Sequence, residues 1–293
     1  MRDEILAKVR NTFHLRHGHG IVEQSGGAGA LFNGDFSSNT TAGAEFAGSR
    51  LGLGVMHDLD GEVVSVRGTT WRVPESGVPV EVSPTEGIAF GIAAHGGREH
   101  QIHIPVGSDM SGILSAIEVY LAANLVDHED VVCAVEIVGR FSNVLLRTEA
   151  APTFPEETLD EVLEHEIRFE FDEWRGTLVG FRFPDASDGQ IIPGLHFHAI
   201  SANQDSGGHV HQVVTTDVSA TSWVDELHPV HHYAGVSSAA IGLYSRTTRR
   251  VARTIRPAAI VAPRRKKTDV SSSSPAWAKS ANMKIVIPIT AMV

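Results

Sequence analysis

The sequence predicts an α+β fold that is rich in β-structure and carries few helices. Short runs of β-branched and aromatic residues, separated by turn formers, recur from about residue 51 to residue 226. Apolar residues at helical spacing are clearest in one segment, 108–125. A strand–helix–strand order also appears twice, which indicates two comparable halves at about 28–125 and 126–226.

The first 27 residues are interpreted as an N-terminal extension with a short amphipathic helix candidate. His17-Gly18-His19 follows among glycines, but no third histidine returns to it, so we expect a solvated segment. The terminus is charged and lacks the apolar core of a secretion signal. No run of about eighteen apolar residues is present to span a membrane. We therefore expect a cytoplasmic protein.

Residues 51–66 predict a β-hairpin with Asp60-Gly61 as its tight turn. Glu62 starts the second strand, and physical chemistry alone predicts an ordinary polar strand end there. Further strand segments are expected at 71–73 and 88–92. Three histidines that follow are expected at the surface: His95, His100 and His103.

The second half begins with a predicted helix at 108–125, for which Ser108 and Asp109 are capping candidates. A β-branched run at 131–138 and a second run at 141–148 predict two strands. Arg147 lies at the end of the latter, where it would ordinarily be a rim residue with a salt-bridge partner.

A capping box, Thr158-x-x-Glu161, predicts a short helix that ends near residue 165. Strands are then expected at 167–171 and 176–183. They lead to a segment with a denser pattern of histidines.

His196 and His198 are two residues apart, so on a strand both imidazoles leave the same face. The turn formers of 203–208 can reverse the chain and return His209 beside the pair. Three neutral imidazoles from one hairpin can hold Zn²⁺ and leave one position open, as in catalytic zinc sites. His211 is a same-face competitor of His209 on such a strand.

Composition limits the other possibilities. A chain of 293 residues with 42% hydrophobic residues can form one large or two modest domains. A formal charge of −11 argues against general nucleic-acid affinity. Cys133 is the single cysteine, which excludes an intrachain disulfide and a cysteine-based zinc site.

Three motifs, in this order and spacing, resemble those of the acetolactate decarboxylases: Gly-Thr-Leu-Val-Gly-Phe at 176–181, Pro-Gly-x-His-x-His at 193–198 and Gly-Gly-His-Val at 207–210. The resemblance implies that His196, His198 and His209 bind Zn²⁺, and it is the reason to prefer His209 over His211. It also implies a duplicated α+β fold, with two mixed sheets in one continuous core over residues 28–226.

The same resemblance gives two further residues a role. Leu-Asp-Gly-Glu at 59–62 is similar to a family motif whose glutamate points into the active site, which makes Glu62 the candidate proton carrier. Arg147 matches a strand arginine and becomes a substrate-contacting cation. The implied activity is decarboxylation of (S)-2-acetolactate to (R)-acetoin and CO₂. Leu195 departs from the family, which usually has an aromatic residue there.

The C-terminal segment, 227–293, departs from the family. No glutamate follows Glu226, while arginines accumulate and a basic run, Arg264-Arg265-Lys266-Lys267, precedes a serine-rich stretch. We expect a disordered basic tail. The resemblance also implies a second active-site glutamate from near the end of the chain, and this sequence has no glutamate after Glu226 to match it.

Two other classes of protein share parts of this pattern. A cupin-like metal oxygenase also uses a strand His-x-His but needs a carboxylate ligand a few residues on, where Ala202-Asn203-Gln204 stands. A non-enzymatic metal-binding or DNA-associated protein could use the basic tail. The expected partner is acetolactate, with no membrane and no nucleic acid, and a homodimer is allowed for.

Overall fold

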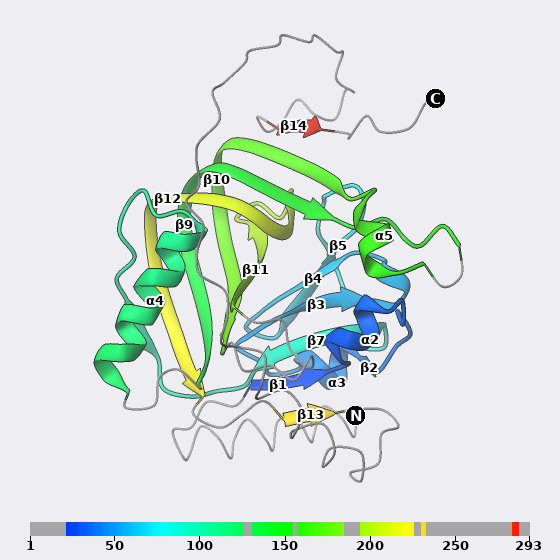
Figure 1. The fold of residues 1–293 in the computed structure, drawn as a ribbon, viewed down its shortest axis with the longest axis horizontal. Helices are drawn as coiled ribbons and strands as arrows, with labels where there is room; N and C mark the ends of the chain where they lie inside the picture. The colour runs from blue at the N-terminus through cyan, green and yellow to red at the C-terminus, as the bar shows by residue number, and fades with distance from the viewer. Residues whose placement is uncertain are drawn as a thin grey trace, which may run out of the picture.

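A computed structural model describes residues 22–125, 131–154, 157–184, 194–225, 230–232 and 283–286 (Figure 1). Within these ranges the chain forms two β-sheets and a few helices, so the predicted β-rich α+β class is confirmed. None of the described helices is long and apolar enough to cross a membrane.

The first sheet has the strand order β13-β1-β7-β3-β4-β5-β6, with β2 paired to β7. Its strands are β1 (Val22–Ser25), β2 (Thr40–Thr41), β3 (Leu51–Met56), β4 (Glu62–Val66), β5 (Thr69–Val73), β6 (Val80–Glu81), β7 (Gly87–Ala94) and β13 (Val230–His232). Three short helical segments accompany them: α2 (Ala28–Phe32), α3 (Ala42–Phe46) and the 3₁₀ turn η1 (His57–Leu59).

The second sheet has the order β11-β10-β9-β12-β8, with β14 paired to β10. Its strands are β8 (His100–Ile102), β9 (Val132–Thr148), β10 (Ile167–Phe183), β11 (Gly194–Ser201), β12 (Gly207–Asp225) and β14 (Met283–Val286). Because β11 also pairs with β12, strands β9, β10, β11 and β12 close into a ring of pairings. The closed ring brings β11 and β12 together, and the histidines lie on these two strands.

The strands of this ring are longer than predicted. The two strands expected at 131–138 and 141–148 are one strand, β9, and those expected at 167–171 and 176–183 are one strand, β10. The prediction of a break was wrong because Gly139 does not turn the chain. A Cβ at Gly139 would lie 2.1 Å from the carbonyl oxygen of Asp217, so glycine there permits close approach of β12.

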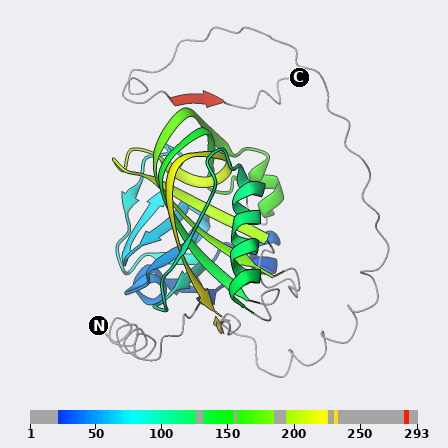
Figure 2. The same cartoon turned by 90° about the vertical axis from the view of Figure 1, so that its left-hand side faces the viewer.

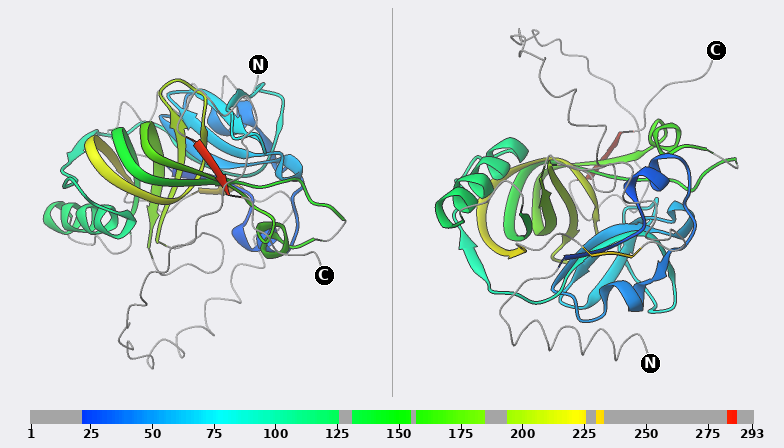
Figure 3. Two further views of the ribbon diagram at one scale, coloured as in Figure 1. Left: turned by 90° about the horizontal axis from the view of Figure 1, so that it is seen from above. Right: turned by 60° about the horizontal axis from the view of Figure 1, so that its bottom comes forward.

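Two of the three apolar clusters among the described residues fix the position of the second sheet. One lies between the sheets and includes Leu53 and Val64 of the first sheet with Phe181 of the second. The other lies under α4 (Met110–Asn124), which buries Ile113 and Ile117 against the outer face of the second sheet. Figures 2 and 3 show α4 on the side of this sheet that is remote from the first sheet. The inner faces of the two sheets therefore enclose the functional residues.

Helix starts follow the predicted capping residues. Asp109 caps α4, with its carboxylate accepting from the Gly112 backbone N–H at 2.9 Å. The capping box of Thr158 and Glu161 is present at α5 (Leu159–Leu163), so both predictions are confirmed.

The hairpin expected at 51–66 is also present as β3 and β4, but Asp60-Gly61 is not a two-residue turn. Val55 pairs with Glu62, so η1 and its flanking residues form a longer connection. Asp58 and Leu59 take positive φ angles there. The prediction failed because these residues of the expected strand fold as a 3₁₀ turn.

Strands occur in both segments that were expected to flank the domain. β1 lies within the expected extension 1–27, and Val22 is the first residue of the chain that the structure describes. In the segment 227–293, β13 pairs in parallel with β1 and β14 pairs antiparallel with β10, unlike an entirely disordered tail. The pair His17 and His19 and the basic run 264–267 lie outside the described residues.

Candidate active site

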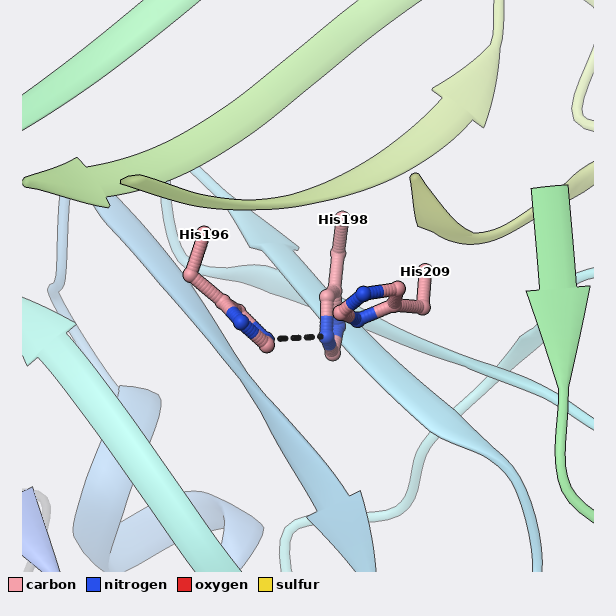
Figure 4. A group of neighbouring side chains, drawn as sticks. All are labelled: His196, His198 and His209. Carbon is pink, nitrogen blue, oxygen red and sulfur yellow. Dashed lines mark hydrogen bonds between the residues drawn. The ribbon is translucent and has the colours of Figure 1, made fainter. Parts of the chain in front are cut away.

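The three histidines singled out from the sequence converge on one point. His196 and His198 lie on β11, and His209 on β12 pairs in register with His198. Ring centroids lie 4.5 Å apart for His196 and His209, and 5.4 Å apart for His198 and His209. Figure 4 shows the three rings side by side beneath the hairpin. The hairpin therefore forms as the sequence predicted.

The β11–β12 turn is built from the residues expected to reverse the chain. Ser201 Oγ accepts hydrogen bonds of 3.0 Å from the backbone N–H groups of Asp205 and Ser206. Gly208 has a φ of 132°, and a Cβ there would lie 2.3 Å from the carbonyl oxygen of Arg147. Glycine thus lets β12 lie directly against β9, where His209 pairs with Arg147.

His211 does not join the group. Val210 pairs with Leu146 and Gln212 with Leu145, so His211 is the extra residue of a β-bulge. The His211 ring still lies edge-on to that of His209, with ring centroids 5.5 Å apart, but His211 is not one of the three residues whose ligand atoms lie within 4.8 Å of one another. Its Nε2 instead lies 3.3 Å from Oε2 of Glu166.

The ring nitrogens have the spacing of ligands to one ion. His198 Nδ1 lies 2.7 Å from the carbonyl oxygen of Val63, so its proton is assigned to Nδ1 and Nε2 keeps a lone pair. His196 Nε2 lies 3.2 Å from that Nε2, and His209 Nδ1 is buried without a hydrogen bond. One nitrogen from each of the three rings can be chosen so that all three nitrogens lie within 4.8 Å of one another. Two nitrogens at about 2.0–2.1 Å from a tetrahedral Zn²⁺ lie roughly 3.3 Å apart, so the donor set fits such an ion.

Burial keeps these imidazoles neutral. It lowers the pKa of His196 and His209 well below the usual value, and the positive charge of Arg147 adds to the effect. Burial likewise lowers the pKa of His198 to about 4, although its hydrogen bond to Val63 acts in the opposite direction. A neutral imidazole offers a lone pair, so all three are ready to bind a cation at neutral pH.

Glu62 reaches from the first sheet to the histidine group. It is 1% exposed, its Oε2 lies 3.3 Å from His198 Nε2, and its Oε1 lies 3.7 Å from Arg147 Nη1. Burial raises the pKa of Glu62, while Arg147 and a hydrogen bond with Glu149 oppose the rise. A buried carboxyl of this kind can hold and release a proton near neutrality.

Arg147 is surrounded by three carboxyl groups. Nη1 contacts Glu149 as well as Glu62, and Nε lies 3.3 Å from Glu166 Oε2. Burial alone would lower the pKa of Arg147, but the three carboxyl groups together raise it, so the guanidinium stays charged. None of these contacts within the described part of the chain involves Nη2, which leaves that donor for a ligand.

Two of these acidic residues were missed in the sequence. Glu149 lies two residues beyond Arg147, and that spacing was the available signal, because alternate residues of an extended chain share a face. Glu166 gave no signal, since its contact with Arg147 depends on the pairing of β9 with β10.

His95 was expected at the surface, and this prediction is wrong. The residue is fully buried, and its Nε2 lies 3.8 Å from Glu23 of β1. It follows Ala94, which pairs with strands on both sides, so the chain leaves β7 within the sheet rather than at its edge. His100 is half-buried and His103 is exposed.

Comparison with known proteins finds one family in both the family model and the related sequences. The model of the family described as alpha-acetolactate decarboxylase matches residues 22–231. The alpha-acetolactate decarboxylase of Methylococcus capsulatus is 31% identical over 199 residues, which cover 68% of this chain and 75% of that protein. The one from Brevibacillus brevis is 26% identical over 204 residues, which cover 70% of this chain and 68% of that protein.

Solved structures share the fold. The alpha-acetolactate decarboxylase of Bacillus subtilis strain 168 matches with a TM-score of 0.63 at 22% identity, over 74% of this chain and 90% of that one. A Staphylococcus aureus protein described as similar to alpha-acetolactate decarboxylase matches with a TM-score of 0.63 at 20% identity, over 73% and 89% of the two chains. These identities establish similarity of fold alone.

Proposed function

We propose that this chain, which belongs to the alpha-acetolactate decarboxylase family, converts (S)-2-acetolactate to (R)-acetoin and CO₂ with a bound Zn²⁺. Membership in that family makes the chain an enzyme of the carboxy-lyase class. The observation that carries the finer proposal is the convergence of three neutral imidazoles, a guanidinium and a buried carboxyl on one point.

His196, His198 and His209 would hold the ion. Three protein ligands leave a fourth position open to substrate, which is the pattern of catalytic rather than structural zinc sites. When bound, Zn²⁺ supplies a Lewis acid that stabilises the negative charge developing on the ketone oxygen of the substrate. The hydrogen bond from His198 to Val63 fixes the ring orientation that this role needs.

Arg147 would bind and orient the substrate. Acetolactate carries a carboxylate, and the carbon–carbon bond that breaks must stand perpendicular to the ketone plane. Glu149 and Glu166 hold the guanidinium from two sides, so its plane is fixed before substrate arrives. Nη2 can then form a charge-assisted hydrogen bond to a substrate oxygen.

Glu62 would deliver the proton that replaces CO₂ on the substrate carbon. Its carboxyl is buried beside His198 and Arg147, so the proton is released into the site and not to bulk water. Since one residue on one side supplies the proton, the product should be a single enantiomer of acetoin.

Product analysis tests the proposal. Zinc-loaded protein given racemic acetolactate should form CO₂ and (R)-acetoin in equal amounts, and a chelator should stop the reaction until Zn²⁺ is restored. Zinc-loaded protein that forms no acetoin would refute the proposed function. Racemic acetoin would refute the role of Glu62 alone.

A further inference from the structure

The side chains that face the site from the second sheet form a row across four strands. Residues directly opposite one another in paired antiparallel strands project from the same face. His198 pairs with Val179 of β10 and with His209 of β12, and His209 pairs with Arg147 of β9. The row therefore has an apolar side chain at one end, two imidazoles in the middle and a cation at the other end.

A second row faces it from the first sheet. Glu62 pairs with Val55 of β3 on one side and with Val73 of β5 on the other. Both valines belong to the apolar cluster between the sheets, so they project from the same inner face as Glu62. The Glu62 carboxyl thus reaches the histidine group from between two valine side chains.

Val73 lies at the Arg147 end of the site. Its carbonyl oxygen accepts a hydrogen bond of 2.7 Å from Oγ1 of Thr148, the residue that follows Arg147. A Cβ at Gly207 would lie 2.9 Å from Cγ2 of Val73, so this valine also packs under the start of β12. The neighbours of Val73 are therefore the two strands that carry Arg147 and His209.

Val55 lies at the opposite, apolar end. It is on the other side of Glu62 from Val73, and its strand β3 contacts β10, the strand of Val179. Val55 keeps 7% of its surface exposed, whereas Leu53 on the same face of β3 is fully buried. Part of the Val55 side chain therefore borders accessible space beside Glu62, where a substrate group can contact it.

The substrate of the proposed reaction has a matching polarity. The carbon of acetolactate that loses CO₂ carries a carboxylate, a hydroxyl, an acetyl group and a methyl group. In the proposed orientation the carboxylate lies at Arg147, and the hydroxyl and ketone oxygens face the three histidines. Because that carbon is tetrahedral, the methyl group then points away from the guanidinium, toward Val55 and Val179.

We propose that Val55 and Val179 are specificity-determining residues that limit this alkyl group to a methyl. The inference rests on the proposed function, because it uses the substrate orientation given there. An ethyl group would press one more carbon against two β-branched side chains, which have few alternative rotamers. An apolar pocket discriminates one methylene by about 10- to 200-fold. Wild-type kcat/KM should therefore be lower by such a factor for 2-ethyl-2-hydroxy-3-oxobutanoate than for acetolactate.

The test measures CO₂ release from both substrates by the full-length, zinc-loaded protein. Val55→Ala removes two methyl groups from the apolar end, so kcat/KM for the ethyl substrate should rise by about 10-fold or more relative to that for acetolactate. Val55→Thr keeps the shape of valine and should keep the wild-type preference. Val135→Ala is the control, because Val135 is a buried valine of β9 in the cluster under α4. It should change stability without changing the preference.

Binding of unreactive analogues separates selection by size from an effect on the chemical step. 2-Hydroxy-2-methylbutanoate and 2-ethyl-2-hydroxybutanoate lack the ketone, so they cannot lose CO₂ by this reaction. Calorimetry should show that wild type binds the methyl compound more tightly, and that Val55→Ala binds the two compounds with similar Kd. Zinc content should equal that of wild type, because no histidine is changed.

Equal kcat/KM of wild type for the two substrates would overturn the proposal, and so would a wild-type preference that persists in Val55→Ala. If Val55→Ala fails to fold, Val179→Ala decides, since it enlarges the same end of the site from the second sheet. A shifted preference in Val135→Ala would also contradict the proposal, because a looser core would then explain the effect. Wild-type protein that releases no CO₂ from acetolactate would instead refute the proposed function, and this inference with it.

Discussion

Replacing Arg147 by lysine tests how the site holds its substrate. Arg147 Nη1 and Nε contact carboxyl groups on two sides, Glu149 and Glu166, and its Nη2 is left for the substrate. A lysine ammonium is a single point charge, so it can contact one of these partners but cannot reach Glu149, Glu166 and the substrate together. Arg147→Lys should therefore keep the charge and the metal but lose the planar fork of donors.

The magnitude follows from the interaction that is lost. A hydrogen bond to a charged group is worth about 1.5–3 kcal/mol. If it is made to the transition state, its loss lowers kcat/KM by roughly 10- to 150-fold. Zinc content should stay at the wild-type level, because the histidine ligands are unchanged. Continuous measurement of CO₂ release, with metal analysis of the same samples, gives both quantities.

Arg182→Lys is the matched control. Arg182 is about as buried as Arg147, but it binds Glu118 of α4 and the carbonyl oxygen of Val131 instead of the site. This control should change stability without changing kcat/KM. If Arg147→Lys turns over like wild type, or no worse than Arg182→Lys, then Arg147 does not bind the substrate and our reasoning about the fork is wrong.

Further predictions concern the metal, the proton and the tail. Alanine at His196, His198 or His209 should abolish zinc binding while His211→Ala retains it; the opposite result for His209 and His211 would overturn the ligand set. Glu62→Gln should bind zinc but lose turnover and enantioselectivity, and an active, enantioselective variant would exclude the role of Glu62. In the metal-free protein, burial raises the pKa of Glu149 to about 8, above its value in the unfolded chain. The protonated Glu149 therefore stabilises the fold fully below the unfolded-state pKa, and this contribution is lost as pH rises toward 8. The slope is about 1.4 kcal/mol per pH unit for one proton, and urea unfolding of Glu149→Gln should show less of this loss than wild type. Limited proteolysis should leave a zinc-binding fragment that ends near residue 228, whereas loss of zinc on removal of the tail would show that β13 or β14 is needed for the site.

The histidine hairpin was predictable because its information is local. A period of two places His196 and His198 on one face, and turn formers with Gly208 return His209 to them. Helix starts were predictable for the same reason, since Asp109 is separated from its partner N–H by only three residues.

Features that depend on pairing between distant strands were not predictable. Glycine is common in turns, so Gly139 suggested a turn between two strands. Only the close approach of the Asp217 backbone shows that Gly139 lies inside one long strand, at a point where β12 packs against it. The burial of His95 follows from strands on both sides of β7, and the bulge at His211 from its register with β9. A single sequence contains no local signal for any of these.

The carboxyl groups around Arg147 were likewise not fully predictable from the sequence. The resemblance pointed to Glu62 and to a second glutamate that has no counterpart near the C-terminus. The structure places Glu149 and Glu166 against Arg147, although neither residue lies in one of the motifs. Burial and a shared guanidinium, rather than a motif, single these residues out.

Zinc titration of the metal-free protein tests the central claim most directly. The protein is stripped with a chelator, and CO₂ release from acetolactate is measured after each addition of Zn²⁺. Activity should be absent without metal, rise linearly with added zinc and reach its plateau at one Zn²⁺ per chain, with no rise in His198→Ala. Full activity in the stripped protein, or one bound Zn²⁺ per chain with no CO₂ released, would contradict the account.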